Sequence, residues 1–179
     1  KAPVNKIKEF LSDGKKFNVK IHYSEEDTPL GTGGAIKKAE HFFRNRFFVL
    51  YGDIMTNIDL KKLAAFHAKK NALLTIVLHE SDHTYDSDMV EVDKDSRIVK
   101  FLGKPDNSRP LKSNITKTSI FVAEIDIFNL MKKDRRSFER DSLPELIKTG
   151  KVYGYFTKEF IKDIGTINRL EELNKITQE

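Results

Sequence analysis

Residues 46–53 read Arg-Phe-Phe-Val-Leu-Tyr-Gly-Asp, and this stretch decides the fold. Its apolar run predicts a short buried strand, and the Gly-Asp pair predicts that the strand ends there in a turn. Two further strand patterns and two helical patterns alternate around it, at residues 17–23, 33–43, 60–69 and 72–79. This β–α–β–α–β order predicts an α/β fold, with a Rossmann-like, mostly parallel sheet and flanking helices.

The second half of the chain is richer in strand patterns. Its expected strands lie at residues 89–92, 97–102, 115–123, 151–156 and 159–164, and its expected helices at 125–131, 143–148 and 168–176. The first two strands read as a hairpin around a turn at 94–96. Because no repeat, low-complexity tract or Pro/Gly linker divides the chain, we expect a single domain over residues 1–179.

The charge of the chain is weakly basic. It holds 32 Lys and Arg against 27 Asp and Glu, a net charge of +5 over 179 residues. The basic residues are scattered in pairs such as Lys15-Lys16 and Lys69-Lys70, and no run of five occurs. This excess suits an anionic small substrate and equally suits an ordinary solvated surface, and it argues against a nucleic-acid-binding protein.

Other function classes are excluded by what the sequence lacks. There is no cysteine, which rules out disulfides, thiolate catalysis and a Cys-rich zinc site. The longest apolar runs are far too short to span a bilayer, and no signal peptide precedes them. We therefore expect a cytoplasmic protein. Because the chain begins Lys1-Ala2-Pro3, we also expect it to be a processed or cut piece of something longer.

Two aspartates follow strand-like runs and are candidate metal ligands. Asp53 ends the run quoted above, and Asp163 ends a second run before Gly165-Thr166. Ligands bind at the carboxyl ends of strands in open parallel sheets, and magnesium prefers one or two carboxylates with phosphate oxygens. Either aspartate is also suited to capping a turn or a helix. If both hold one ion, they should approach each other at the edge of one sheet.

A glycine-rich stretch precedes the helical pattern at 33–43. It contains three glycines within residues 31–34. Backbone amides exposed there can approach a base or a phosphate closely, although a tight loop entering a helix has the same composition. No Lys-Ser/Thr pair follows, so the stretch is not a Walker motif.

Two further features have a functional and a plain interpretation. Lys104 follows the strand at 97–102 and suits a phosphate-binding point charge or a solvated surface position. His79, Asp82, His83, Asp86 and Asp88 have the composition of a metal site. They fall in a stretch with Ser and Thr between two strands, so we expect a polar loop and no zinc.

Taken in order, these pieces resemble the sugar-1-phosphate nucleotidyltransferase family. The resemblance runs along nearly the whole chain, and its four motifs lie at residues 20–35, 48–53, 98–105 and 163–166. No single motif is decisive, but four in this order are specific. Within the family, residues 86–93 and 158–163 look like those of guanylyltransferases that act on mannose-like or heptose 1-phosphates.

The resemblance implies a fold, a reaction and a site. It implies a fold of the nucleotide-diphospho-sugar transferase type and nucleotidyl transfer from a nucleoside triphosphate, GTP favoured, to a sugar 1-phosphate. The matching family motifs further imply that Asp53 and Asp163 hold Mg²⁺. They also imply that Lys104 binds the sugar phosphate in the same cleft, away from residues 31–34. The nucleotide would be contacted by Leu30, Gly31, Thr32, Gly33 and Gly52. Assembly into homo-oligomers is left open.

The sequence departs from the family pattern in three places. The N-terminal phosphate loop, Gly-Gly-x-Gly-Thr-Arg, is absent. Gly103 stands where the family has Glu, and Lys117-Thr118-Ser119 stands where it has Asn-x-Gly. A non-catalytic sugar-nucleotide-binding fragment, or a pseudoenzyme partner subunit, is therefore the alternative. We expect this chain alone to turn over poorly and the longer parent protein to make a nucleotide sugar with magnesium.

Overall fold

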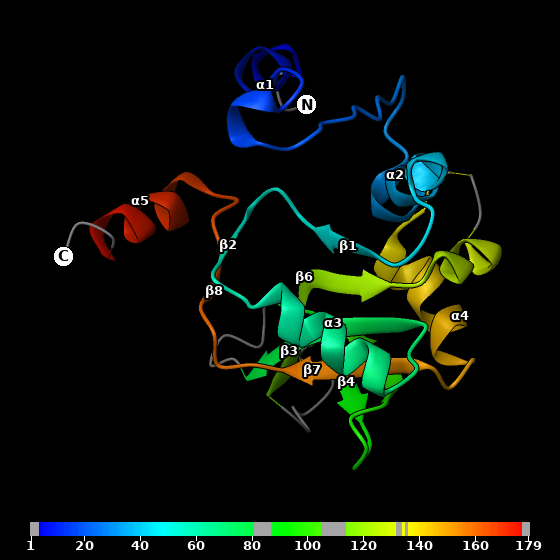
Figure 1. Ribbon diagram of the computed structural model, residues 1–179. Coiled ribbons are helices and arrows are strands. Elements are labelled where there is room, and N and C mark those ends of the chain that lie inside the picture. The colour runs from blue at the N-terminus through cyan, green and yellow to red at the C-terminus, as the bar shows by residue number, and fades with distance from the viewer. Residues whose placement is uncertain (1–3, 81–86, 105–113, 132–133, 135, 177–179) are drawn as a thin grey trace.

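A six-stranded sheet forms the centre of the molecule (Figure 1). The computed structural model describes residues 4–80, 87–104, 114–131, 134 and 136–176. The strands are β1 (Phe47–Leu50), β3 (Leu74–Glu80), β4 (Met89–Val92), β5 (Ile98–Gly103), β6 (Ile115–Ala123) and β7 (Val152–Phe156). The sheet order is β5-β4-β6-β3-β7, and β1 also pairs with β6.

The strand directions explain how far the sheet is parallel. β6 is antiparallel to β1, β3 and β4, and β7 is parallel to β3. β1, β3, β4 and β7 therefore all run the same way, and β5 and β6 run against them. The predicted α/β class is confirmed. Four of the six strands run in the same direction, which agrees with the predicted mostly parallel sheet. However, β6 is antiparallel and lies between several of them. Among the described strands, the neighbours that pair in parallel are therefore β3 and β7.

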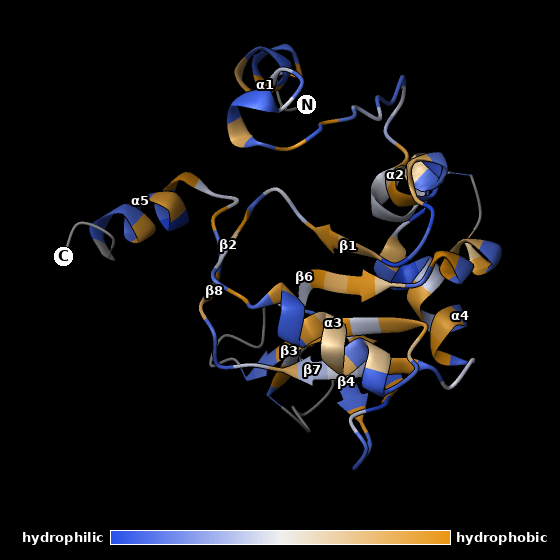
Figure 2. Cartoon of the chain, viewed as in Figure 1, coloured by the Kyte–Doolittle hydropathy of each residue, from blue (hydrophilic) through white to orange (hydrophobic). Residues whose placement is uncertain are grey.

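Helices cover both faces of the sheet. α3 (Leu60–Lys69), which has the predicted bounds, packs Leu63 with Val77, Ile120 and Val122 on one face. The neighbouring strand positions point to the other face because side chains alternate along a strand. That face carries the larger core, made with η4 (Ile125–Leu130), η5 (Phe138–Ser142) and α4 (Leu143–Ile147). Figure 2 shows the apolar residues gathered in these layers.

Three further pieces lie at the margins. β2 (Ile54–Thr56) and β8 (Ile161–Asp163) form a separate two-stranded antiparallel sheet. It leads into α5 (Ile167–Ile176), which stands away from the main sheet, as does α1 (Val4–Leu11), in Figure 1. α2 (Gly31–Lys38) and η2 (Ala39–Phe42) lie near η5 at the other end of the sheet.

The predicted strand at 17–23 is wrong. A short helix, η1 (Lys15–Phe17), occupies its start, and Asn18 adopts the left-handed conformation with a φ of 56°. The residues after it belong to no described strand, and the alternating Phe17 and Val19 are about half exposed. An alternating pattern indicates a strand only where a partner strand covers its apolar face, and here the described chain supplies none.

Candidate functional site

The structure brings Asp53 and Asp163 together. Ile54, the first residue of β2, pairs with Asp163, the last residue of β8, and the Ile164 amide donates to the Asp53 carbonyl at 2.8 Å. A methyl group built on Gly165 would lie 3.1 Å from Asp53 Oδ2 and 3.2 Å from Asp163 Oδ1. The two carboxylates therefore face one point. They do so on the two-stranded sheet and the turns beside it, beyond the end of β1, with Asp163 at the carboxyl end of β8.

This pair fits a magnesium ion by its chemistry. Both side chains offer carboxylate oxygens, which magnesium prefers, and both residues are exposed, which leaves room for water and phosphate ligands. Asp163 also accepts from the Gly165 amide at 2.8 Å and pairs with Arg169 at 2.9 Å. Within the described residues, no group of three or more His, Asp or Glu side chains could hold a metal ion.

Asp163 lines a cavity of about 710 Å³, a size typical of small-molecule sites. Lys104 lies in its wall with Lys117 of β6 and with Asp88, which precedes β4, and Arg169 of α5 lines another side. The structure therefore places Lys104 in one cleft with Asp163, as predicted. The glycine-rich residues do not line this cavity. Pro105, the last residue of the expected motif, lies outside the described residues.

The glycine-rich stretch is built differently from the predicted loop. Gly31 is the first residue of α2, and Gly33 and Gly34 lie inside that helix and are buried. The amides of Gly33 and Gly34 both donate to the Arg136 carbonyl, at 2.9 and 3.4 Å. A methyl group on Gly31 would lie 2.5 Å from the same carbonyl oxygen, and the φ of Gly31 is +72°. These glycines are therefore needed for close backbone packing against the segment before η5.

Leu30 and Gly52, the other two expected nucleotide contacts, have different surroundings. The Leu30 amide donates to Glu26 Oε2, and the Leu30 carbonyl accepts from the Arg136 amide at 2.8 Å. Gly52 sits in the exposed turn between β1 and β2, where an added Cβ would meet no atom within 4 Å. The chain itself does not require a glycine there, and the open space admits a ligand close to the backbone.

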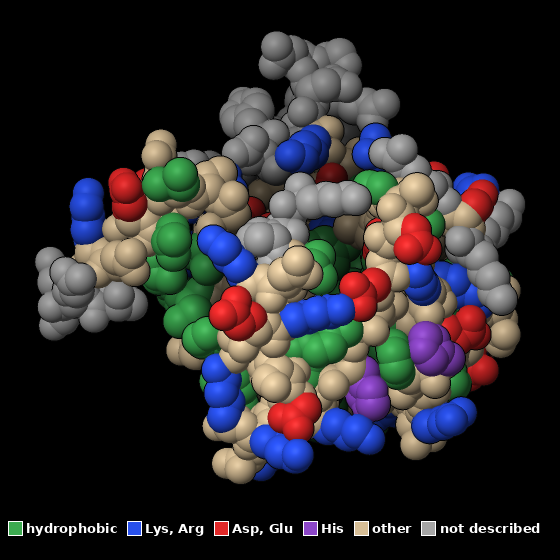
Figure 3. All heavy atoms as spheres, turned by 90° about the horizontal axis from the view of Figure 1, so that it is seen from above, with side chains coloured by type: hydrophobic (Ala, Val, Ile, Leu, Met, Phe, Trp, Pro, Cys, Tyr) green, Lys and Arg blue, Asp and Glu red, His purple; other side chains and the backbone are tan. Residues whose placement is uncertain are grey.

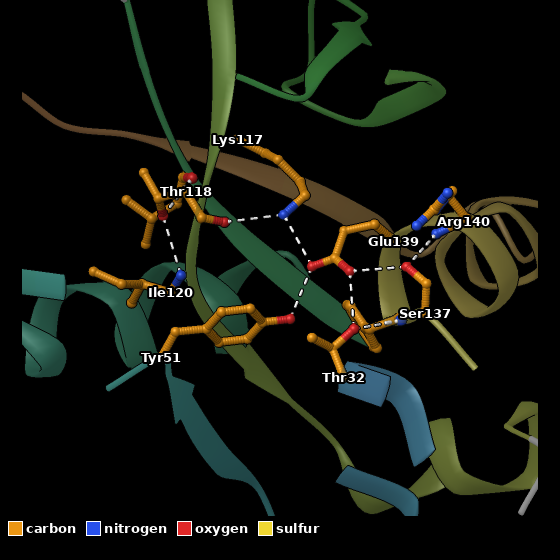
Figure 4. Close-up of polar contacts among 10 residues, drawn as sticks. Thr32, Tyr51, Lys117, Thr118, Ile120, Ser137, Glu139 and Arg140 are labelled. Atoms are coloured by element: carbon orange, nitrogen blue, oxygen red, sulfur yellow. Dashed lines mark hydrogen bonds and ion pairs between the residues drawn. The ribbon is translucent and has the colours of Figure 1, made fainter. Parts of the chain in front are cut away.

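Sequence reasoning missed a polar network centred on Glu139, which Figure 4 shows. Its Oε1 accepts from the Tyr51 hydroxyl at 2.8 Å and from the Lys117 ammonium at 3.3 Å. Its Oε2 accepts from the Thr32 hydroxyl at 3.0 Å and from the Ser137 hydroxyl at 3.2 Å. The available signal was Lys117 itself, which replaces the asparagine of the family pattern. No periodicity marks Glu139.

The network shifts the pKa values of two of its members. Burial alone would raise the pKa of Glu139, but the charge of Lys117 and the Tyr51 and Thr32 hydrogen bonds hold it below the ordinary value. Burial first, and then the neighbouring Glu139 charge, raise the pKa of Tyr51 far above its ordinary value. Near neutral pH, Glu139 is therefore an anion that accepts a hydrogen bond from a neutral tyrosine.

The remaining sequence candidates contribute less. His79 lies in β3 and lines the cavity, and burial lowers its pKa. Asp82, His83 and Asp86 lie outside the described residues.

Figure 3 shows basic and acidic side chains interspersed over the face it presents, in keeping with the scattered lysine pairs. Across the described helices, none is both long and apolar enough to cross a bilayer.

Comparison with known proteins identifies the family. The family model described as nucleotidyl transferase matches residues 2–179. The chain belongs to the nucleotidyl transferase family. Curated relatives agree with the resemblance expected from the four motifs. A mannose-1-phosphate guanylyltransferase from Mycobacterium tuberculosis is 30% identical over 87% of the chain, and a bifunctional protein GlmU from Methanococcus maripaludis is 31% identical over 88%. The chain spans 44% and 38% of these two relatives, less than half of each.

Solved structures share the fold. HddC from Yersinia pseudotuberculosis superposes with a TM-score of 0.80 at 26% identity, over 98% of this chain and 75% of that one. A Bacillus anthracis protein crystallised with sucrose gives a TM-score of 0.84 at 20% identity, over 98% of this chain and 72% of that one. The fold of these proteins is therefore present in this chain.

Proposed function

We propose that this chain carries the nucleotide, sugar phosphate and metal subsites of a sugar-1-phosphate nucleotidyltransferase, with GTP and a mannose-like 1-phosphate as the favoured substrates. The observation that carries the proposal is the convergence of Asp53 and Asp163 beside a cavity that Lys104 also lines. GTP is favoured because relatives from several organisms, including the Mycobacterium tuberculosis protein, are guanylyltransferases of mannose 1-phosphate.

The reaction needs positioning more than covalent chemistry. An oxygen of the sugar 1-phosphate attacks the α-phosphorus of the nucleoside triphosphate in line, the bond to the bridging α–β oxygen breaks, and pyrophosphate leaves. Holding the two anions together supplies much of the rate enhancement. Asp53 and Asp163 would hold Mg²⁺, which neutralises phosphate charge when bound. The Lys104 ammonium would bind the sugar phosphate.

The nucleotide subsite is assigned to the first turn of α2 and the turn after β1. The amides of Gly33 and Gly34 are already bonded to the Arg136 carbonyl, so we assign the amides of Gly31 and Thr32 in that turn to the ligand. Gly52 leaves open space on the neighbouring turn. We assign the contacts with the nucleotide to these residues together with Leu30.

Binding of the product tests this assignment most simply. GDP-mannose contains both halves of the reaction, and we expect calorimetry to show that the chain binds it in the presence of magnesium. Asp53→Asn should weaken that binding about tenfold or more, because the ion would lose a charged ligand. The exposed Glu145→Gln on α4, whose side chain pairs with Lys148 on the surface, is the matched control.

Pyrophosphate release from GTP and mannose 1-phosphate separates the two functional alternatives. Release that requires both substrates and magnesium supports the enzyme. Binding of GDP-mannose without any release supports a non-catalytic sugar-nucleotide-binding chain. If neither GDP-mannose nor any other nucleotide sugar bound, and Asp53→Asn changed nothing, the proposed subsites would be wrong.

A further inference from the structure

The two halves of the proposed site meet at one buried carboxylate. Thr32 belongs to the nucleotide half, at the first turn of α2, and Lys117 belongs to the sugar phosphate half, in the wall of the cavity with Lys104. Each is bonded to a different oxygen of Glu139, Thr32 to Oε2 at 3.0 Å and Lys117 to Oε1 at 3.3 Å. Figure 4 shows Glu139 lying between them.

The surroundings of Glu139 restrict its motion. The side chains of Glu139 and Lys117 are 13% and 7% exposed, so both charges are largely withdrawn from bulk water, and each also borders a cavity. The Tyr51 and Ser137 hydroxyls complete the hydrogen bonds to the two carboxylate oxygens. A buried charge that lacks its partners is costly, so the network has one favourable arrangement. Thr32 and Lys117 are therefore held at a fixed separation.

We propose that Glu139 is a positioning residue that holds the nucleotide half and the sugar phosphate half of the site in register, through Thr32 and Lys117. Lys117 thereby becomes a second cation for the sugar phosphate, beside Lys104, at the position where the family pattern has asparagine. The proposal rests on the proposed function. Glu139 itself need not touch either substrate, because its two oxygens are occupied by protein donors.

A second hydrogen bond of Thr32, from the Phe138 amide, supports this proposal. The Thr32 hydroxyl also accepts from the Phe138 amide at 2.8 Å, so α2 and the start of η5 are joined at the side chain as well as through the Arg136 carbonyl. A change at Glu139 therefore reaches the first turn of α2 by two routes. The same change reaches the large cavity through Lys117, and Glu139 also lines a smaller pocket together with Lys104.

Separate binding measurements with GTP and with mannose 1-phosphate test whether Thr32 serves the nucleotide half, Lys117 the sugar phosphate half, and Glu139 both. Calorimetry on the whole chain with magnesium should show that Thr32→Val weakens GTP binding about fivefold and leaves mannose 1-phosphate unchanged. Lys117→Met should weaken mannose 1-phosphate binding and leave GTP binding unchanged. Glu139→Gln, which has the same shape and no charge, should weaken the binding of both GTP and mannose 1-phosphate. Thr32→Ser and Lys117→Arg keep the hydroxyl and the charge and should restore most of the affinity. Glu145→Gln is the control for loss of a carboxylate.

The outcomes separate this proposal from the proposed function. If wild type binds both ligands and Glu139→Gln binds them equally well, the positioning role is wrong and the proposed function stands. If wild type binds neither ligand, the proposed function fails and the division into two halves fails with it. Should Glu139→Gln not fold, Glu139→Asp keeps the charge but shortens the reach, and it must weaken both ligands for the proposal to survive.

Discussion

Two charged pairs border the same region of the molecule, and they differ in what surrounds them. Asp53 and Asp163 are exposed, with 48% of the Asp163 side chain accessible, and they belong to turns and a two-stranded sheet. Lys117 and Glu139 are almost completely buried, and their partners come from the main sheet, α2 and η5. The first pair is open to ligands that come from solution, whereas protein partners already surround the second, of which Lys117 also borders the large cavity.

The difference also concerns rigidity. A two-stranded sheet by itself is marginally stable, so the carriers of Asp53 and Asp163 can adjust when an ion and phosphates bind. The buried pair cannot adjust without leaving a charge unpaired. We infer that the molecule separates the two tasks, with ligands bound by exposed carboxylates and the distance between subsites fixed by a buried ion pair.

The largest expected effect comes from breaking the buried pair. Glu139→Ala leaves the Lys117 ammonium buried without its anion, and we expect the free energy of unfolding to fall by about 3–5 kcal/mol. Urea denaturation measures it. Asp163→Ala removes an exposed carboxylate and should change stability by no more than about 0.5 kcal/mol. The double variant Lys117→Met, Glu139→Leu should recover much of the loss. Equal losses for Glu139→Ala and Asp163→Ala would contradict the contrast.

The sequence predicted the exposed pair and missed the buried one. Asp53 and Asp163 each follow a strand-like run and match a motif, so both signals lie within a few residues of the aspartate. Glu139 is defined by Thr32, Tyr51 and Lys117, which come from three other parts of the chain. Contacts of that kind depend on the tertiary structure, and no local pattern encodes them.

The same reason explains which elements were predicted. α3 and β6 have the expected bounds, because their patterns are long and each packs its apolar positions into the core. The expected strand at 17–23 had an equally clear alternation but no partner. The glycines at 31–34 were expected in a loop, because their burial against Arg136 is a tertiary contact that composition does not reveal.

A comparison of two glycines sharpens the contrast between packed and open regions. Gly31 has a φ of +72° and no space for a methyl group, so Gly31→Ala should lower the free energy of unfolding by about 2 kcal/mol. Gly52 has open space around it, and Gly52→Ala should change stability by less than about 0.5 kcal/mol. If Gly52 approaches the nucleotide, the second variant should nevertheless weaken GTP binding. Thermal or urea unfolding and calorimetry on both variants decide between these results.

A smaller effect is expected from the buried histidine of α3. His67 is fully buried between the Thr75 hydroxyl, at 2.8 Å, and Glu124. Burial and the nearby Arg46 lower its pKa, against the opposing effect of Glu124. The unfolded chain therefore takes up a proton at a higher pH than the folded chain does. Stability should be full above pH ~6.5 and fall below it, by at most about 1.4 kcal/mol per pH unit.

Replacing the histidine checks the origin of that pH dependence. His67→Gln should flatten the decline in stability between about pH 6.5 and 5. His41 is exposed, and His41→Gln should leave the decline unchanged. A decline that survives in His67→Gln would have to arise elsewhere, for example at the half-buried His79.

The most direct test of the central claim is metal binding at the two aspartates. Manganese reports on a magnesium site through its paramagnetism, and its affinity for the chain can be measured with saturating GTP present. We predict that wild type binds one manganese ion, that Asp53→Asn and Asp163→Asn each weaken it about tenfold or more, and that Glu145→Gln leaves it unchanged. Unchanged manganese affinity in both aspartate variants would contradict the claim that Asp53 and Asp163 hold the ion.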